Sequence, residues 1–377
     1  MRGAGGSSSE RSRLHQLYDD FGQSPWIDNL ARPMLRSGQF HRLVDLGVRG
    51  VTSNPTIFAK AFEAGTDYDQ RFADQVAVHT VEDAYWELVI EDVSAALDVM
   101  EPVHDQSGGT DGFVSLEVAP AIAHDVAATT KAARYLHGRI DRPNLLVKIP
   151  ATKEGVGAIR TMVGEGADIN VTLIFGLGRY DEVMEAYLSG LEAVDGDLSG
   201  VQGVASFFVS RVDTLVDRLL EEVGTPRALA LRGKVAVAQA KVAYQHFRST
   251  FSGPRWEALR ARGACPQRPL WASTSTKNPA YPDLLYVDAL IGPDTVNTMP
   301  DATLEAFLDH GTPARTIDTG TAEAQRILDE LAEVGIDMED VARVLEGEGV
   351  ASFAKSYDEL LQRLEDKANE FAGGAGR

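Results

Sequence analysis

The stretch NLLVKIPATKEGVGAIRTMVGEGADINVTLI, residues 144–174, places two short apolar runs, 144–150 and 168–174, on either side of a longer segment that leads into a helix. This order predicts a strand, a crossover helix and a second, parallel strand. The same alternation recurs outward from it in both directions. Eight such runs are expected to form strands: 24–28, 49–54, 112–118, 144–150, 168–174, 203–209, 268–274 and 294–299. Eight parallel strands are the number that closes a (β/α)8 barrel.

Segments of helical period fill the intervals between these runs. In 81–100, apolar residues recur at the spacing of one buried helix face. The other expected helices are 181–191, 228–247, 256–262, 321–334 and 352–371. We therefore predict an α/β fold, a (β/α)8 TIM barrel with additional helices and a C-terminal helix. The expected organisation is a flexible tail over 1–13, a single barrel domain over 14–371 with a helical insertion near 225–267, and a flexible tail over 372–377.

Composition and charge narrow the classes of function. The 377 residues are 44% hydrophobic and 24% charged, which is typical of a soluble globular protein. The net charge of −20 argues against binding to nucleic acid or to an anionic membrane. Cys265 is the single cysteine, so no intrachain disulfide forms, and neither a signal peptide nor a membrane-spanning run is found. We expect a cytoplasmic protein, and a phosphorylated substrate would need local Arg or Lys residues.

Polar residues interrupt the apolar strands near their carboxyl ends. Asn170 and Thr172 share one face of 168–174, and Glu117 stands close to the end of its own strand. Asp28, Asn54, Lys148 and Ser206 likewise lie near strand ends. In a barrel these ends meet at one mouth, where active sites are built. A lone Asn or Ser in a strand is more often a hydrogen-bonded core residue, so Asn54 and Ser206 indicate little individually.

Lys148 is the strongest candidate for catalysis. Its alternatives are an edge strand or an ion pair with Glu117. An amine withdrawn from water loses its proton more readily and becomes a neutral nucleophile that can attack a carbonyl. Lys153 is a rival, but it falls in the turn toward the next helix, where a solvated amine is expected. The sequence has no HExxH, CxxC, P-loop or dinucleotide-binding motif, so we expect neither metal nor cofactor.

Five motifs in order resemble the transaldolase family over most of the chain, roughly from residue 14 to residue 371. They are VTSNPTIF (51–58), NLLVKIPATKEG (144–155), INVTLIF (169–175), SFFVSRVD (206–213) and WASTSTKNP (271–279). The motif WASTSTKNP and the long insertion before it resemble a branch of longer bacterial members of this family, which are also found fused to glucose-6-phosphate isomerase. The chain has no room for that second enzyme.

The resemblance implies transfer of a dihydroxyacetone unit between sugar phosphates in the non-oxidative pentose phosphate pathway. The donors would be sedoheptulose 7-phosphate or fructose 6-phosphate, and the acceptors glyceraldehyde 3-phosphate or erythrose 4-phosphate. Lys148 would form the Schiff base, Glu117 and Thr172 would move protons through a water, and Asp28 would take the C4 hydroxyl proton. The resemblance gives substrate-binding roles to Asn54, Asn170, Ser206, Phe208, Arg211, Ser273 and Lys277. The alignment of Lys277 is ambiguous, because WASTSTKNP departs from the shorter members.

Two alternatives stay open. Fructose-6-phosphate aldolases share the barrel and the lysine, but have glutamine and tyrosine where this chain has Glu117 and Phe208. A barrel without activity that serves as a binding protein is the other alternative, and the intact set of Asp28, Glu117 and Lys148 argues against it. The sequence does not decide between a monomer and a homodimer.

Overall fold

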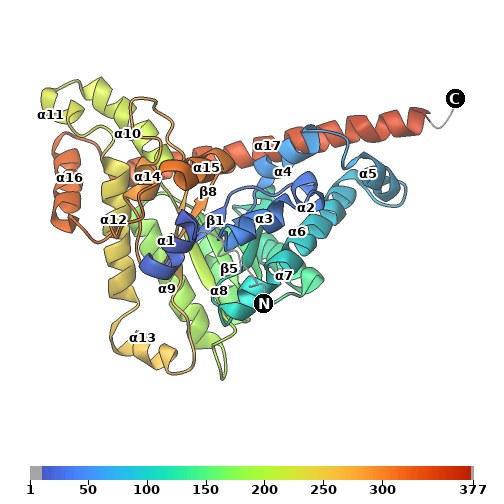
Figure 1. Ribbon diagram of the computed structural model, residues 1–377, viewed down its shortest axis with the longest axis horizontal. Coiled ribbons are helices and arrows are strands. Elements are labelled where there is room, and N and C mark those ends of the chain that lie inside the picture. Colours follow the sequence, from blue (N-terminus) through green and yellow to red (C-terminus); the bar gives the residue numbers. More distant parts are fainter. Residues whose placement is uncertain (1–10, 375–377) are drawn as a thin grey trace, which may run out of the picture.

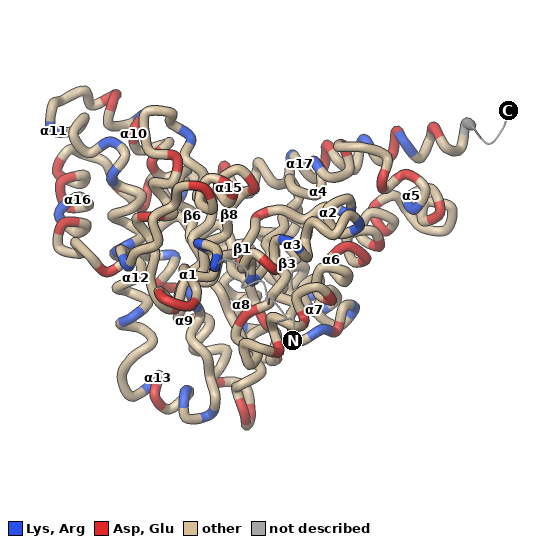
Figure 2. The backbone as a smooth tube through the Cα atoms, in the orientation of Figure 1, with Lys and Arg blue, Asp and Glu red and all other residues tan. Residues whose placement is uncertain are grey.

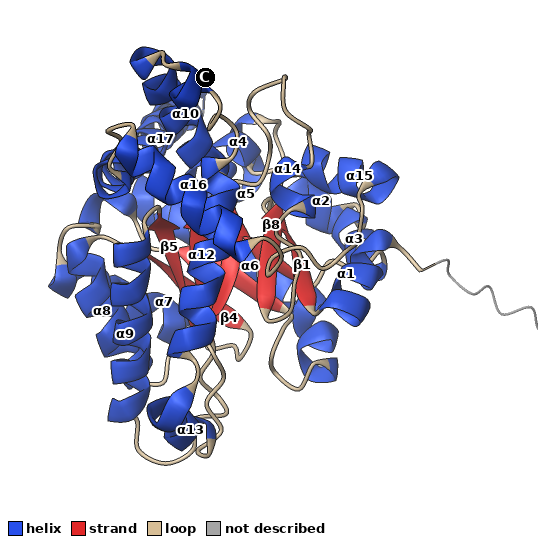
Figure 3. Cartoon of the chain, turned by 90° about the vertical axis from the view of Figure 1, so that its left-hand side faces the viewer, coloured by secondary structure: helices blue, strands red, loops and turns tan. Residues whose placement is uncertain are grey.

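Eight parallel strands form a closed barrel in chain order in the computed structural model, which describes residues 11–374 (Figures 1 and 3). Each strand pairs with the next, and β8 closes the barrel on β1 from Gln23 opposite Thr295 to Ile27 opposite Met299. The strands are β1 (Gln23–Ile27), β2 (Gly50–Thr52), β3 (Phe113–Glu117), β4 (Leu145–Pro150), β5 (Ile169–Ile174), β6 (Gly203–Phe208), β7 (Arg268–Ala272) and β8 (Thr295–Met299). The predicted barrel is confirmed, and each predicted run overlaps one strand.

The strands form because their side chains are buried on both faces, as in other parallel sheets. Trp26 on β1 shows how closely they pack. Its indole lies so near the backbone of Gly50 on β2 that a Cβ at Gly50 would be 2.3 Å from the ring. Only glycine allows this approach, so the width of the barrel at this point depends on Gly50.

Helices surround the barrel on its outer side (Figure 3). Several begin with a side chain that accepts a hydrogen bond from the first turn, as Thr80, Asp125 and Thr152 do. In the first half of the chain these are α1 (Arg13–Phe21), α2 (Arg32–Arg36), α3 (Gln39–Asp45), α4 (Pro55–Glu63), α5 (Asp69–Val76), α6 (Val81–Gln106), η1 (Pro120–Ile122), α7 (Val126–Ile140), α8 (Lys153–Gly164) and α9 (Leu177–Ala193). The second half contains α10 (Ser210–Val223), α11 (Pro226–Leu229), α12 (Val235–Thr250), α13 (Gly253–Arg260), α14 (Leu285–Asp288), α15 (Asp301–His310), α16 (Thr321–Glu333) and α17 (Met338–Gly374). Within residues 11–374, no helix has the length and apolar character needed to cross a membrane.

The C-terminal helix is longer than the sequence pattern predicts. It begins at Met338 rather than at 352, and Asp337 caps it by accepting a hydrogen bond from the backbone N–H of Glu339 at 2.8 Å. Gly347 and Gly349 weaken the helical pattern, which is why the first part was missed. Gly349 has a packing role, because a Cβ there would lie 3.0 Å from Leu173 of β5.

Three other expectations need correction. The predicted helix over 228–247 is broken, because the chain turns at Gly233 with a φ of +68° before α12 begins. At the C-terminus, α17 continues to Gly374, inside the tail expected over 372–377, and 375–377 lie outside the described residues. At the other end 1–10 also lie outside them, but Ser12 caps α1, which starts at Arg13 inside the expected tail.

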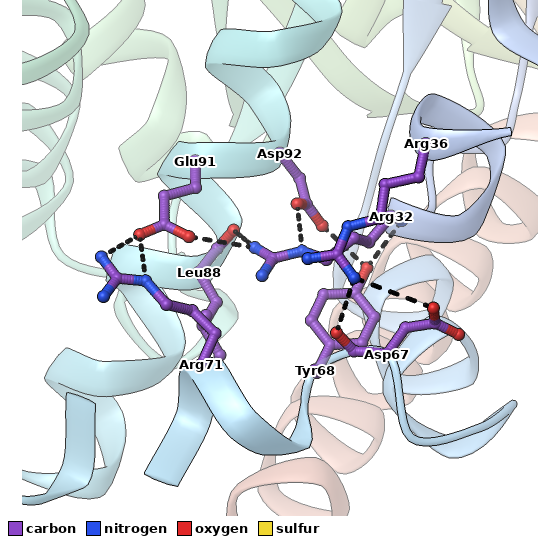
Figure 4. A network of polar contacts seen from close by, with 8 residues as sticks. All are labelled: Arg32, Arg36, Asp67, Tyr68, Arg71, Leu88, Glu91 and Asp92. Carbon is purple, nitrogen blue, oxygen red and sulfur yellow. Dashed lines mark hydrogen bonds and ion pairs between the residues drawn. The ribbon is translucent and has the colours of Figure 1, made fainter. Parts of the chain in front are cut away.

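A buried polar network fixes the segment that follows β1 (Figure 4). Arg32, at the start of α2, donates from Nε to Oδ1 of Asp92 on α6 at 2.7 Å. Tyr68 donates its hydroxyl to the other oxygen of Asp92 at 2.7 Å and accepts from the Arg32 backbone N–H at 3.0 Å. Asp28 lies four residues before Arg32, so the network anchors the short connection on which Asp28 stands.

Candidate functional site

A cavity of about 360 Å³ opens at the carboxyl ends of the strands. Nine of the eleven predicted site residues line it, and the other two, Glu117 and Asn170, each contact a residue that does. The lining residues are Asp28, Thr52, Asn54, Thr56, Ile57, Lys60, Lys148, Thr172, Ser206, Phe208, Arg211, Ala272, Ser273, Ser275, Lys277, Thr298, Pro300, Ser352 and Phe353. The predicted convergence of polar strand ends is therefore observed.

Lys148 and Glu117 form a buried ion pair at the base of this cavity. They face each other across the paired strands β4 and β3, and Lys148 Nζ lies 3.2 Å from Glu117 Oε2. Nζ also donates to the backbone carbonyl of Ser53 at 3.1 Å. Both residues are 3% exposed. The edge-strand alternative is wrong because the barrel is closed, whereas the ion pair is confirmed. Lys153 is exposed at the start of α8 and does not line the cavity.

Glu117 is placed where a carboxyl group can change its protonation state. Burial raises the pKa of Glu117, while the nearby charge of Lys148 opposes the rise. Although Oε2 is within ion-pair distance of Lys148, neither carboxylate oxygen has a well-aligned hydrogen-bond partner among the described residues, and neither does Oγ1 of Thr172. Among the described side chains, the polar contact of the Glu117 carboxylate is therefore the one with Lys148.

Asp28 stands just after β1, on the opposite side of the barrel axis from β4 and β5. Its Oδ1 accepts a hydrogen bond from Thr52 at 2.7 Å, and the Thr52 hydroxyl lies 2.7 Å from that of Thr298. Burial raises the pKa of Asp28, and the charge of Lys148 is the largest influence in the opposite direction. Asp28 therefore has the character of a base that the site can protonate.

Asn170 and Ser206 are linked to each other at the cavity floor. Ser206 donates to Asn170 Oδ1 at 2.7 Å, and Asn170 Nδ2 donates to Ser115 at 2.9 Å. Asn54 has a structural role as well, because its side chain caps α4 by accepting from the backbone N–H of Ile57 at 3.0 Å. The side-chain amides of Asn54 and Asn170 are thus oriented by hydrogen bonds within the protein.

Three cations meet at the mouth of the cavity: Arg211 at the start of α10, Lys277 in the loop after β7, and Lys60 on α4. None of the ion pairs in the described part of the chain involves any of them. Burial lowers the pKa of Arg211, and burial followed by the charges of Arg211 and Lys60 lowers that of Lys277. An uncompensated cluster of this kind favours an anionic ligand.

The cluster contrasts with the rest of the molecule, where acidic and basic residues are scattered over the outer helices (Figure 2). Many of the outer cations are paired, as Arg255 is with Glu185 and Glu192. Ser273 lies beside the cluster, with its hydroxyl 2.9 Å from that of Ser210 and an unusual φ of +55°. Backbone strain of this kind is common at ligand-binding positions.

Sequence reasoning missed ten lining residues: Thr52, Thr56, Ile57, Lys60, Ala272, Ser275, Thr298, Pro300, Ser352 and Phe353. Thr56 and Lys60 are spaced one helical turn apart directly after Asn54, and this spacing could have indicated them. Phe353 could not have been found, because it comes from α17 and reaches the mouth only through the fold. Its ring lies 6.0 Å from the Arg211 guanidinium. In the part of the chain that the structure describes, no three His, Cys, Asp or Glu side chains gather as they would around a metal ion.

Comparison with known proteins agrees with this geometry. The sequence model of the family described as Transaldolase/Fructose-6-phosphate aldolase matches residues 25–364. A protein of Thermobifida fusca named transaldolase is 50% identical over 360 residues, which cover 94% of this chain and 97% of the relative. A transaldolase of Parafrankia sp. is 49% identical over 93% of this chain and 97% of its own length. Transaldolase 1 of Streptomyces avermitilis is 47% identical over 95% and 96% respectively.

Proposed function

Since the chain belongs to the transaldolase/fructose-6-phosphate aldolase family, we propose that it is a transaldolase that moves a dihydroxyacetone unit from a ketose phosphate to an aldose phosphate. One observation carries this proposal. The buried Lys148–Glu117 pair lies beneath a mouth lined by three cations without carboxylate partners. A ligand with a carbonyl group and a terminal phosphate fits this arrangement, because the carbonyl can react with Lys148 while the phosphate binds the cations at the mouth. The cytoplasmic location expected from the lone cysteine belongs to the same proposal.

In the first half of the reaction, Lys148 passes a proton to Glu117, its neutral Nζ attacks the C2 carbonyl of the ketose, and a carbinolamine forms. Loss of water from it needs a group that gives a proton and later takes one back. Glu117 is placed for this role at 3.2 Å from Nζ, with Thr172 as the second side chain that holds the relaying water. The product is a protonated imine joining C2 to Lys148.

The second half breaks the carbon chain. Asp28 removes the proton from the C4 hydroxyl, the C3–C4 bond breaks, and its electron pair passes into the imine to give an enamine. The aldose phosphate leaves with C4 as its aldehyde. An incoming aldose phosphate is attacked by the same enamine carbon, Asp28 returns the proton to the new hydroxyl, and hydrolysis frees Lys148. Asn54, Asn170 and Ser206 are proposed to bind the hydroxyls of the three-carbon unit.

Arg211, Ser273 and Lys277 are proposed to bind the phosphate, with Lys60 as a fourth ligand. An anion binding here would give Arg211 and Lys277 the countercharge that the protein itself does not provide. The high negative charge of the whole chain makes this local arrangement necessary.

Transfer is favoured over simple aldol cleavage by two residues. Glu117 provides a carboxyl group for the dehydration step, and Phe208 gives the cavity an apolar wall with no proton to donate to the enamine. The Phe208 ring packs on Phe175 at 5.1 Å between centroids. Without a proton donor there, the enamine persists until an acceptor arrives.

A coupled assay with fructose 6-phosphate, run with and without erythrose 4-phosphate, tests the proposal. Transaldolase activity requires the acceptor for turnover, and release of free dihydroxyacetone without it would indicate an aldolase instead. Borohydride added with fructose 6-phosphate should label the peptide that contains Lys148, and Lys148→Ala should abolish the labelling. A protein that is neither labelled nor active would be a binding protein, and labelling on Lys153 would overturn the choice of nucleophile.

A further inference from the structure

The loop that carries Lys277 is anchored from the side that faces away from the cavity. The loop runs from 273 to 284, between β7 and α14, and Thr276 closes it by donating to the carbonyls of Pro282 and Asp283 at 2.9 and 3.1 Å. Tyr281, near the end of the loop, donates its hydroxyl to Asp217 Oδ2 at 2.6 Å. Asp217 lies on α10, the helix that begins with Ser210 and Arg211.

Asp217 also reaches the helical insertion. Its second oxygen, Oδ1, accepts from the backbone N–H of Gly233 at 2.9 Å. Gly233 stands between α11 and α12 and packs against Tyr281 so tightly that a Cβ would lie 2.6 Å from the phenol ring. Its φ of +68° adds a second reason for glycine at this point. The insertion, α10 and the loop therefore meet at one carboxylate.

The same arrangement occurs one helical turn earlier on α10. Asp213 Oδ1 accepts from the backbone N–H of Ala236, at the start of α12, at 2.8 Å. Its Oδ2 accepts from the hydroxyl of Tyr286, on α14, at 2.8 Å. Two aspartates at i and i+4 thus each join one backbone N–H of the insertion to one tyrosine that follows β7. We name Asp213, Asp217, Gly233, Tyr281 and Tyr286 the clasp.

Lys277 lies between the clasp and the active-site cavity. A second cavity of about 250 Å³ is lined by Asp213, Asp217, Tyr281, Tyr286 and Lys277 together with other residues, and Lys277 also lines the first cavity. Arg211 and Asp213 lie in the first turn of α10, and Asp217 lies one turn later. The clasp therefore joins the loop that carries Lys277 to the helix that carries Arg211.

We propose that the helical insertion serves, through the clasp, to position Lys277 for phosphate recognition, and that Tyr281 is the positioning residue. This inference rests on the proposed function of the site. Tyr281 contacts no substrate; it acts by holding the loop in the conformation in which Lys277 faces Arg211. The insertion accordingly contributes to the specificity of the enzyme for phosphorylated sugars, although none of its helices lines the active-site cavity.

Tyr281→Phe tests the clasp, because it removes one hydrogen bond and keeps the ring that packs on Gly233. We expect KM for fructose 6-phosphate to rise roughly three- to tenfold with kcat nearly unchanged. Labelling by borohydride with unphosphorylated dihydroxyacetone should be unaffected. Tyr187→Phe is the matched control, since it removes another tyrosine hydrogen bond, to the carbonyl of Cys265 at 3.0 Å, at the opposite end of β7 from Lys277. An equal rise of KM in both variants would overturn the proposal by indicating general loosening.

A double-mutant cycle identifies the route of the effect. Lys277→Met should raise KM by itself, and adding Tyr281→Phe should then change KM by less than twofold, because Tyr281 acts only through Lys277. Effects that multiply in the double variant would overturn the inference.

Inorganic phosphate separates this inference from the proposed function. Phosphate should raise the Tm of the unaltered protein, and by a smaller amount that of Tyr281→Phe. If the protein shows no transferase activity but keeps this difference, the proposed function fails and the clasp stands. An identical rise in both proteins would overturn the clasp even in an active enzyme.

Discussion

Lys148 and Glu117 compensate each other's charge, which allows both side chains to be buried inside the barrel. Moving either charge from water to this depth is unfavourable unless an opposite charge is close, and register across β3 and β4 provides that neighbour. The structural and the catalytic interpretations of Lys148 are therefore compatible. The ion pair places the amine against the group that later exchanges a proton with it. Removing one partner changes both the charge balance and the chemistry.

Glu117→Gln should slow imine formation by about 10²–10⁴-fold, because glutamine has the shape of the acid but transfers no proton. The rate can be followed by rapid mixing with fructose 6-phosphate, with borohydride trapping at each time point. Circular dichroism should match that of the unaltered protein, since Lys148 keeps its hydrogen bond to Ser53. Unchanged trapping kinetics would exclude Glu117 as the proton-transfer group.

Phe208→Tyr should convert part of the activity into aldol cleavage. A hydroxyl at this wall of the cavity would protonate the enamine and release free dihydroxyacetone without an acceptor. The measurement is dihydroxyacetone formed per minute from fructose 6-phosphate alone. Phe175→Tyr is a useful comparison, because Phe175 packs on the same ring without lining the cavity. If neither variant releases dihydroxyacetone and transfer is retained, Phe208 does not control the outcome.

At the scale of elements, the mouth is assembled from pieces that are distant in sequence. Lys60 comes from α4, Arg211 from α10, Lys277 from the loop after β7, and Phe353 from α17. Figure 1 shows α17 passing beside α4, and Thr56 is hydrogen bonded to Ser356 at 2.9 Å where the two helices meet. The C-terminal helix is thus part of the site as well as part of the outer layer.

Arg211→Ala should raise KM for phosphorylated substrates by about ten- to a hundredfold, because this is the loss of affinity expected when one charge-assisted hydrogen bond is removed. Lys60→Gln should have a smaller effect of the same kind, about two- to fivefold, because Lys60 is exposed to solvent. Labelling with dihydroxyacetone, which has no phosphate, should stay unchanged in both. Arg260→Ala, on α13 and lining neither the active-site cavity nor the second cavity, is the control. A KM unaffected by Arg211→Ala would place the phosphate elsewhere.

Sequence patterns predicted the elements better than their contacts. The strands were found because runs such as LLVKI are buried on both faces, and polar positions such as Glu117 and Asn170 stood out against them. Lys60 did not stand out, because a lysine on a helix is ordinarily solvated. The clasp was equally hidden, since Asp213 and Asp217 have the spacing of an exposed helix face. The partners of Asp213 are Ala236 and Tyr286, and those of Asp217 are Gly233 and Tyr281. These pairings depend on how the insertion folds back.

At the scale of the whole molecule, the uneven distribution of charge has consequences for stability. The chain has a net charge of −20, and several of its carboxyl groups are buried. Asp168, before β5 at the opposite end of the barrel from the cavity, is one of them. It accepts a hydrogen bond from the backbone N–H of Gln202 at 2.7 Å, and burial raises its pKa to about 8. The folded protein therefore holds a proton there that the unfolded chain releases near its ordinary pKa of 3.8.

This difference predicts how stability depends on pH. Asp168 makes its full contribution to the free energy of unfolding below pH 3.8, the pKa of its carboxyl group in the unfolded chain. This contribution is lost as the pH rises toward about 8, where the carboxyl group of the folded protein also ionises. Asp168→Asn should abolish this pH-dependent loss of stability, because asparagine is neutral at every pH and keeps an acceptor oxygen for the backbone N–H of Gln202. In urea titrations from pH 5 to pH 8, the stability of the variant relative to the unaltered protein should increase steadily. A constant difference across that range would refute the prediction.

The position of Phe353 also bears on the order in which the protein becomes competent during synthesis. All eight strands precede α17 in the chain, because β8 ends at Met299 and α17 begins at Met338. One wall of the mouth, formed by Ser352 and Phe353, is therefore the last part of the cavity lining to be synthesised. During synthesis, the helix that leaves the ribosome last completes a site whose lysine, carboxylates and loop cations were made before it.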